Sequence, residues 1–330
     1  MHGKRILTIV AAVLVLFALP APASAGESAA LSAPQMPWVL REGHAVTANT
    51  WAGPVGVVSA GDTATAEIER KAGDGTWSRY RDIPLKVTLL SSRPRVWVRF
   101  ALPGRAYWRV RVTLAGVEGR YDATSSPWAS LRTVSHNYVV LTFDDGPRAG
   151  STKPIVDTLA KNGIRGEFFM LGTQVRANPA LARYVVDKGM RPQNHSMDHA
   201  DLARLSRTAV LSEIDRCTRQ IHDATSAHPG WFRPPYGSTN RTVAGAAASR
   251  GLSLVLWSVD PQDWRRPSAA TIASRVIGAT RPGSVVLMHD GGGDRSHTVA
   301  ALPTIISALR RARYDFVTLS EWRTLGAQPR

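Results

Sequence analysis

The segment YVVLTFDDGP, residues 138–147, joins an apolar run to two carboxylates and a Gly-Pro turn. A near-continuous hydrophobic run of this length predicts a strand buried on both faces, as strands of parallel sheets are. Comparable runs follow at 167–171, 252–257 and 284–288. Helical segments separate them, at 152–162, 179–188, 208–223, 240–250, 268–278 and 298–313. The alternation predicts an α/β domain with a mainly parallel sheet over residues 135–330.

Residues 38–134 show a different pattern, with strand signals and no helical period. Apolar and polar residues alternate at 64–70, 95–100 and 107–112, and turn signals such as Gly73-Asp74-Gly75 separate the runs. Several short strands within one such segment predict an antiparallel β-sandwich of the immunoglobulin or fibronectin type. The chain has a single cysteine, Cys217, so no disulfide supports a true immunoglobulin domain. We expect this cysteine to be buried in a helix.

Tryptophans are numerous in the predicted sandwich, at positions 51, 77, 97, 108 and 128. Exposed tryptophans could stack on sugar rings, which would make the sandwich a carbohydrate-binding module. Alternation would instead bury most of them, and Trp97 and Trp108 are in phase with neighbouring core positions. Carbohydrate binding and a spacer role therefore both remain open for this domain.

The pattern of the N-terminal residues is typical of an export signal. Lys4 and Arg5 precede an apolar run from Ile6 to Leu19, and the small residues Ala23-Ser24-Ala25 follow. This pattern predicts a signal peptide over residues 1–25, cleaved near Ala25, and a secreted or cell-wall-associated protein. The run is shorter than the ~20 residues that span a bilayer, so we expect no integral membrane protein. Residues 26–37 are small, polar and proline-containing, which predicts a linker.

The formal net charge is +16, and the excess of arginine is spread over both halves of the chain. A nucleic-acid-binding protein usually concentrates its charge in a patch interleaved with aromatic residues, and the sequence contains no such cluster. We therefore expect no nucleic-acid partner. Electrostatic association with an anionic cell wall is more consistent with an exported basic chain, which we expect to be a monomer.

Two short segments carry residue types suited to a metal centre. Asp144 and Asp145 stand where the first strand meets its turn, so one carboxylate could bind a cation while the other acts as a base. His195 and His199 are spaced i and i+4, which would place both on one side of a helical turn. One carboxylate and two imidazoles leave a fourth position open, as in catalytic zinc sites. Zinc is preferred, although cobalt, nickel or manganese could occupy the same ligands.

Three further segments follow or end predicted strands: RPPYG at 233–237, DPQDW at 260–264 and LMHD at 287–290. In parallel α/β folds, chemistry collects at the carboxyl ends of the strands. Taken in order, the five segments resemble the signature of the polysaccharide deacetylase family, the NodB-homology carbohydrate esterases, over residues 138–325. The resemblance implies an incomplete, distorted (β/α) barrel that removes acetyl groups from N-acetylglucosamine in peptidoglycan or a chitin-like polysaccharide.

The resemblance also implies a role for each matching residue. Asp145, His195 and His199 would bind one divalent metal ion, and Asp144 would be the catalytic base. His289 would be the general acid. Arg233 would hold Asp144 in place, and Asp263 would orient His289. The backbone N–H of Tyr236 would stabilise the oxyanion, and Trp264 and Leu287 would form the walls of the acetyl pocket.

One departure from the family pattern stands before the second motif, where a glycine usually precedes Asn-His. This chain has Pro192-Gln193-Asn194, which we expect to stiffen the approach to His195 and to add a side chain beside the metal. Two other functions remain open. The same site would also cleave the O-acetyl esters of a xylan-type polymer, and a catalytically silent protein could bind glycan in the wall.

Overall fold

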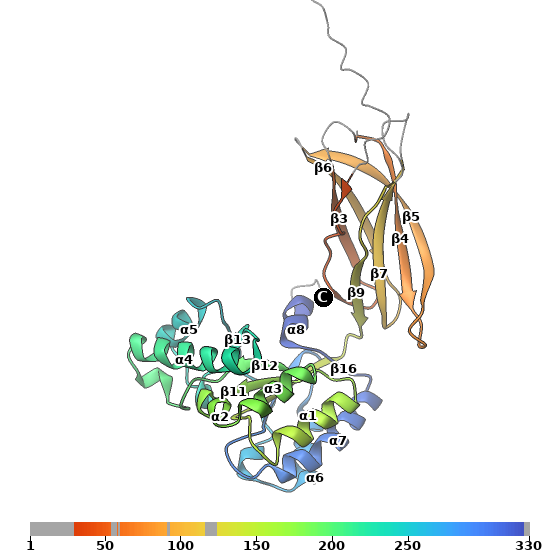
Figure 1. Cartoon of the computed structure of the whole chain (residues 1–330). Coiled ribbons are helices and arrows are strands. Elements are labelled where there is room, and N and C mark those ends of the chain that lie inside the picture. The colour runs from red at the N-terminus through yellow and green to blue at the C-terminus, as the bar shows by residue number, and fades with distance from the viewer. Residues whose placement is uncertain (1–29, 54–57, 59, 91–92, 116–123, 327–330) are drawn as a thin grey trace, which may run out of the picture.

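The structure, a computed structural model, describes residues 30–53, 58, 60–90, 93–115 and 124–326. An antiparallel β region comes first along the chain, and a parallel α/β barrel region follows it (Figure 1). The signal peptide expected over 1–25 lies outside the described residues. Within the described ranges, no helix is both long enough and apolar enough to cross a membrane.

The barrel region is built on a seven-stranded parallel sheet, in the order β14-β13-β12-β11-β10-β15, with β16 pairing to the start of β10. Its strands are β10 (Tyr138–Asp144), β11 (Glu167–Met170), β12 (Arg191–Asn194), β13 (Trp231–Phe232), β14 (Ser253–Leu254), β15 (Ser284–His289) and β16 (Asp315–Phe316). Every residue of β10 is buried, as its apolar run predicts, because helices and neighbouring strands cover both of its faces.

The expected strand over 252–257 is interrupted. Only Ser253–Leu254 forms β14, and the chain then bends so that Val259 makes a parallel bridge to Val286 of β15. Leu287 N–H donates to the Val259 carbonyl at 2.9 Å. This single bridge joins the two ends of the sheet, which confirms the incomplete, distorted barrel.

The helices pack around this sheet and include the six that the sequence predicts. They are α1 (Thr152–Lys161), α2 (Gly172–Ala177), α3 (Pro179–Asp187), α4 (Arg207–Thr225), α5 (Arg241–Ala248), α6 (Ala269–Ala279), α7 (Ser296–Arg311) and α8 (Leu319–Gly326). Helix α4 begins where the Ser206 hydroxyl accepts a hydrogen bond from Ala209 N–H. Its buried face includes Ile214, Cys217 and Ile221, so Cys217 is a core residue, and burial raises the pKa of its thiol to about 12. The sequence misses α2 and α8.

The β region forms one path of strands, β1-β3-β6-β5-β4-β7-β9-β2, with β8 pairing to β7. The strands are β1 (Ala30–Leu31), β2 (Val39–Arg41), β3 (Ala45–Gly53), β4 (Thr63–Lys71), β5 (Trp77–Leu90), β6 (Arg93–Ala101), β7 (Ala106–Leu114), β8 (Thr124–Ser125) and β9 (Ala129–Val134). The first half of β5 pairs with β4 and its second half with β6, so this strand joins the two halves of the sheet around one apolar core. All pairs are antiparallel except β2 with β9.

The burial of Trp108 and Trp97 tests the alternation of buried and exposed positions that the sequence predicts. Trp108 is fully buried, as expected, and its indole N–H donates to Thr133 Oγ1 at 2.9 Å. The expectation for Trp97 is wrong, because Val96 and Val98 take the buried positions of β6 and leave Trp97 38% exposed on the opposite face.

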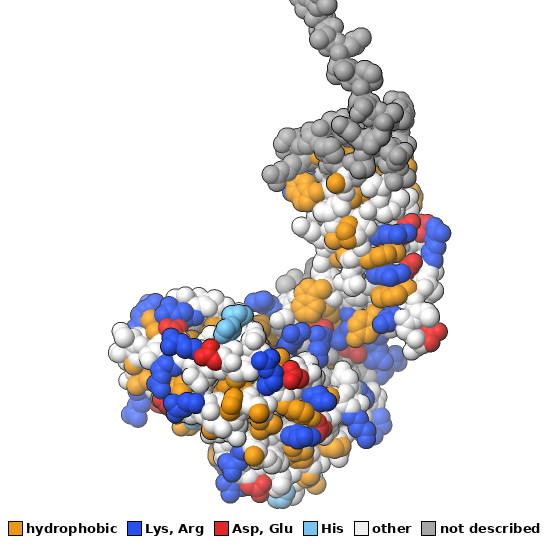
Figure 2. All heavy atoms as spheres, viewed as in Figure 1, with side chains coloured by type: hydrophobic (Ala, Val, Ile, Leu, Met, Phe, Trp, Pro, Cys, Tyr) orange, Lys and Arg blue, Asp and Glu red, His pale blue; other side chains and the backbone are white. Residues whose placement is uncertain are grey.

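A band of alternating hydrophobic and basic side chains runs along the outer face of the β region (Figure 2). The Arg109 guanidinium lies 4.7 Å from the ring centroid of Trp77 and 4.3 Å from that of Trp128, and Arg111 lies 4.7 Å from Trp128. Glu69 and Glu67 pair with these two arginines. The ring faces of Trp77 and Trp128 therefore contact guanidinium groups, an arrangement that stabilises the sheet surface.

Part of the expected linker 26–37 pairs with the β region. Strand β1 joins the edge of β3, and Gln35 bridges Asn49. Edge strands leave unpaired backbone groups that an adjoining extended segment satisfies, which accounts for this order in a polar stretch. The composition of the segment gave no sign of this pairing.

The β region meets the barrel at the end where β10 begins, and α8 lies between them and contacts both β2 and β10 (Figure 1). Val39 and Val134 belong to the same buried apolar cluster as Leu319 and Leu325 of the barrel region. The Arg41 guanidinium donates to the Leu325 carbonyl at 3.1 Å. The two regions thus share a small core, whose burial opposes their separation.

Candidate metal and catalytic centre

The two aspartates of the first motif stand at the carboxyl end of β10. Asp144 is the last strand residue, and Asp145 takes a left-handed conformation at φ 72°, which turns the chain. The loop after β15 packs directly against this turn, since a Cβ on Gly146 would lie 2.1 Å from Asp290 Oδ2. Only glycine permits that approach, and it brings the ends of β10 and β15 together.

The two histidines reach the same place from a loop, so the expectation of a helical turn is wrong. His195 continues β12, and its N–H donates to the Met170 carbonyl at 3.0 Å. Ser196 and His199 then take left-handed conformations at φ 71° and φ 63°, which fold the loop back. His199 Nε2 and His195 Nε2 lie 3.2 and 3.4 Å from Asp145 Oδ1. Tertiary folding, rather than helical periodicity, brings the pair together.

The orientation of the His195 ring follows from its partner. Its Nδ1 lies 2.7 Å from the Arg233 carbonyl oxygen, which can only accept, so Nδ1 donates there and Nε2 is the nitrogen that faces Asp145. This arrangement is typical of a metal-binding histidine, whose second nitrogen is held by a hydrogen bond. Asp145 Oδ1 is buried and has no hydrogen-bond donor among the described residues.

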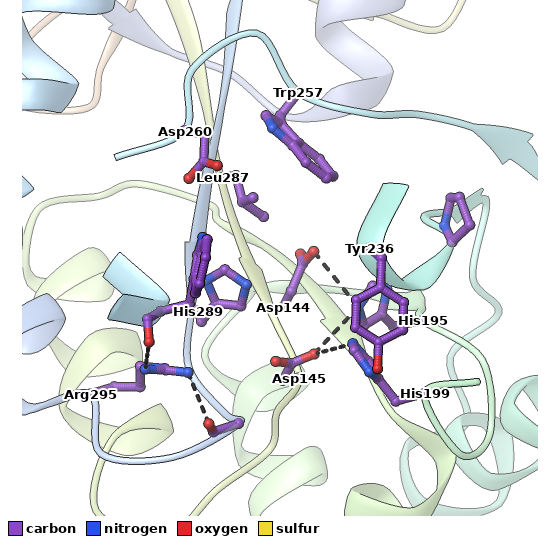
Figure 3. Close-up of a pocket in the computed structure, with 13 residues that line it drawn as sticks. Asp144, Asp145, His195, His199, Tyr236, Trp257, Asp260, Leu287, His289 and Arg295 are labelled. Carbon is purple, nitrogen blue, oxygen red and sulfur yellow. Dashed lines mark hydrogen bonds and ion pairs between the residues drawn. The ribbon is translucent and has the colours of Figure 1, made fainter. Parts of the chain in front are cut away.

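Electron-pair donors from Asp145, His195 and His199 thus converge within 4.8 Å of one another (Figure 3). Burial alone would raise the pKa of Asp145, yet the contacts with His195 and His199 hold it well below its usual range. An ionised carboxylate oxygen that faces two imidazole nitrogens suits a bound cation. The three groups fit one divalent ion of the kind that nitrogen and oxygen ligands bind.

Asp144 is not part of this triad, because one of its carboxylate oxygens pairs with the buried Arg233 guanidinium. Arg233 Nη1 donates to Asp144 Oδ1 at 2.7 Å and to Thr142 Oγ1 at 2.7 Å, and the arginine is fully buried. Burial lowers the pKa of Arg233 and the Asp144 charge opposes that shift, so the guanidinium remains charged. Asp144 Oδ2 lies 3.8 Å from His195 Nε2, which directs the free oxygen toward the triad. The expected partnership of Arg233 with Asp144 is present in the geometry.

His289 ends β15 and faces the aspartates from the other side (Figure 3). Its Nδ1 and its backbone N–H donate to the two oxygens of Asp263, at 2.7 and 2.9 Å. Thr298 Oγ1 donates to the same carboxylate at 2.8 Å, and Asp263 is 1% exposed. Burial would lower the pKa of His289, but the hydrogen bond and charge of Asp263, with the charges of Asp144 and Asp145, raise it to about 9.

These groups line a cavity of about 510 Å³. The residues expected at the substrate are also present: Leu287 is buried in its wall, whereas Trp264 and Tyr236 are 44% and 69% exposed. Tyr236 takes a left-handed conformation at φ 61° in the short helix η2 (Pro235–Gly237). Its ring packs edge-on against His199, with centroids 4.5 Å apart.

The cavity is also lined by residues to which the sequence assigned no role, among them Trp257, Asp260 and Arg295. Trp257 ended a predicted strand, so its place at the carboxyl edge was a usable signal. Arg295 is 4% exposed, and it donates to the carbonyls of Gly291 and Gly292 at 2.7 and 2.9 Å. It thereby holds the loop after His289, a role that its surrounding sequence does not indicate.

The expectation that Gln193 lies beside the metal is wrong. The Gln193 amide nitrogen donates to Glu167 Oε2 at 2.7 Å, and its carbonyl accepts from the N–H groups of Gly230 and Trp231. Glu167 is the first residue of β11, so the amide points toward the amino end of the barrel. Burial raises the pKa of Glu167 to about 7. Gln193, the residue that departs from the family pattern, therefore forms hydrogen bonds inside the barrel rather than at the metal site.

An Asp-His-His metal triad at the carboxyl edge of an incomplete parallel barrel defines the class of metal-dependent carbohydrate esterases. Residues 132–255 match the family described as polysaccharide deacetylase.

Known proteins agree with this class. A chitooligosaccharide deacetylase of Bradyrhizobium sp. is 40% identical over 195 residues, which cover 56% of this chain and 89% of that protein. The peptidoglycan-N-acetylglucosamine deacetylase PgdA of Listeria monocytogenes is 36% identical over 218 residues, covering 64% of this chain and 46% of PgdA. The solved structure of a family 4 carbohydrate esterase from Streptomyces lividans, in complex with acetate, matches with a TM-score of 0.53 and 39% identity, over 56% of this chain and 94% of that one.

The chain belongs to the polysaccharide deacetylase family. It spans slightly less than half of the length of the Listeria protein, and the Streptomyces structure matches 56% of this chain.

Proposed function

We propose that this chain is a secreted, metal-dependent deacetylase that hydrolyses the acetamide of N-acetylglucosamine residues in a cell-wall or chitin-like polysaccharide. The observation that carries the proposal is the buried, donor-free Asp145 Oδ1 facing two histidine nitrogens, with Asp144 and His289 on either side. The names of the relatives support the substrate class. Secretion rests on the sequence of residues 1–25, and zinc rests on the donor types.

A divalent ion held by Asp145, His195 and His199 would polarise the acetyl carbonyl and favour deprotonation of the attacking water. Asp144 is placed to receive the water's proton at Oδ2, because Arg233 already occupies its Oδ1. The new C–O bond then forms at the carbonyl carbon. We infer that the Tyr236 N–H donates to the oxygen that becomes negative.

The C–N bond breaks only when the leaving nitrogen gains a proton, since an amide anion is a poor leaving group. His289 Nε2 would donate it, because Nδ1 is already committed to Asp263. The products are acetate and a free amino sugar. Leu287 and Trp264 would enclose the acetyl methyl group and exclude water from it, and the exposed rings of Tyr236 and Trp264 suit stacking on a sugar face.

The test is acetate release by zinc-loaded protein from chitooligosaccharide, peptidoglycan and acetylated xylan. We expect release from the two N-acetylated substrates and loss of it in Asp144→Asn, with zinc content unchanged. Release from acetylated xylan alone would replace the proposal with an O-acetyl esterase. No release from any of the three by zinc- or cobalt-loaded protein would leave a glycan-binding role.

A further inference from the structure

A second concave surface lies where the β region meets the barrel, and we call it the junction cleft. Its volume is about 860 Å³, and its walls come from β4, β7 and β9 on one side and from α7 and β16 on the other. Its basic members are Arg70, Lys71, Arg105, Arg132 and Arg310. Figure 2 shows Lys and Arg side chains at this junction.

The junction cleft is distant from the metal triad. Strand β16 pairs with the start of β10 at Tyr138, whereas Asp144 and Asp145 stand at the other end of β10. Seven strand residues span about 20 Å. A molecule in the junction cleft would therefore leave the catalytic cavity free.

The positive charge of the cleft is only partly compensated. Among its described lining residues, Asp315 is the one carboxylate, and it pairs with Arg105 at 3.3 Å and accepts from Ser135 N–H at 2.6 Å. Arg132 has Glu321 at 3.6 Å. The other three cations, Arg70, Lys71 and Arg310, have no carboxylate within 4.0 Å in the part of the chain that the structure describes, and all three are exposed.

These cations come from distant parts of the sequence, and folding brings them to one surface. Like charges gathered within a Debye length of about 8–10 Å repel each other, and a bound anion would relieve that repulsion. Arginine offers planar, forked donors that match phosphate oxygens in a bidentate manner. The arrangement therefore favours a phosphate-bearing ligand, and five cations from both regions around about 860 Å³ favour a chain of phosphates over a single ion.

We propose that the junction cleft binds a linear polymer that carries repeated phosphate groups and no bases. A single-stranded nucleic acid would need several free aromatic faces for stacking. Among the lining residues, Tyr107 is 56% exposed, while Tyr314 and Phe316 are half-buried. Charge rather than stacking is thus the recognition element. The polymer would contact both regions of the chain and anchor the protein while its catalytic cavity remains open, a role beyond the deacetylase function and independent of it.

The experiment measures binding of the full chain to a short linear inorganic polyphosphate, as a function of salt. The cleft variant is Arg70→Gln/Lys71→Gln/Arg310→Gln. The control variant, Arg99→Gln/Arg207→Gln/Arg241→Gln, removes the same charge from exposed positions outside the cleft. A single Lys71→Glu protein reverses one exposed charge, in case the triple variant does not fold.

We expect the cleft variant to bind polyphosphate at least ~10-fold more weakly and the control variant less than ~2-fold more weakly. The slope of log K against log salt should be about −3.5 for the parent chain and shallower by about 2 for the cleft variant, since each of the five cations contributes about 0.7. Lys71→Glu should weaken binding in the same direction.

Three outcomes would overturn the proposal. Equal weakening in both triple variants would mean that net charge alone attracts the polymer. Equal or tighter binding of oligothymidylate, lost in the cleft variant, would make the partner a nucleic acid. Equal binding of polyglutamate would show that phosphate is not recognised.

Discussion

Replacing Asp263 with Asn tests how the proton on His289 is held. The Asp263 carboxylate accepts from His289 Nδ1, from His289 N–H and from Thr298 Oγ1. An asparagine retains one acceptor oxygen but removes the charge and places an NH₂ group opposite one of these donors. The variant should therefore lose both the charge on His289 and a pH-independent part of its stability, about 1–3 kcal/mol for an unmatched buried donor.

The magnitude follows from the pKa of His289, which is raised from 6.5 to about 9. Each pKa unit corresponds to about 1.4 kcal/mol, so the charged form stabilises the metal-free fold by about 3 kcal/mol. Because the folded-state pKa is raised, this contribution is complete below pH ~6.5 and is lost as the pH rises through ~9. In Asp263→Asn the pKa of His289 is lowered by burial and raised only by the more distant Asp144 and Asp145. Most of the stabilisation by the charged form should therefore be absent.

Two assays check this expectation. Chemical denaturation of chelated protein should show a stability gap between the parent and Asp263→Asn that narrows by up to about 3 kcal/mol from pH 6 to pH 10. In the metal-loaded enzyme, the descending limb of kcat against pH should move at least about one unit lower in the variant. Its position in the parent should fall below 9, since a cation offsets the charge of Asp145.

Thr298→Val is the matched control, because it removes one hydrogen bond from Asp263 and leaves its charge. Its stability loss should be nearly independent of pH, and its kcat limb should stay in place. A limb in Asp263→Asn that coincides with the parent limb would refute the assignment of Asp263 as the residue that holds His289 protonated. A stability gap that does not change with pH would refute the assignment equally.

Other perturbations probe the rest of the molecule. Exhaustive chelation should abolish acetate release, zinc or cobalt should restore it, and His195→Ala should lower zinc affinity measured by competition with a chromogenic chelator. Arg233→Met should destabilise the fold by about 3–5 kcal/mol in urea denaturation, because it leaves Asp144 buried without its cation. A protein of residues 138–330 alone should unfold more readily than the full chain, by about 3–6 kcal/mol at most in the barrel transition, since it lacks Val39 and Val134 from the shared core. Unchanged unfolding of that fragment would show that the shared core contributes nothing.

Much of the barrel follows from local sequence. The apolar run of β10 requires burial on both faces, and the amphipathic period of α4 or α7 requires one face against the sheet; neither depends on distant residues. The short strands β12 and β13 were not predictable, because a few paired residues carry no periodic signal. They exist through hydrogen bonds to neighbours already in place.

The sequence by itself determined which residue types form the centre, since two carboxylates, two histidines and their partners occur in short segments in a fixed order. The tertiary structure decided how they meet. Left-handed residues in the loop after β12, rather than a helix, aim His199 at Asp145. It also decided that Gln193 points away from the metal and that dispersed cations such as Arg70 and Arg310 share one cleft. Contacts between residues far apart in sequence have no local period, so only the folded chain fixes them.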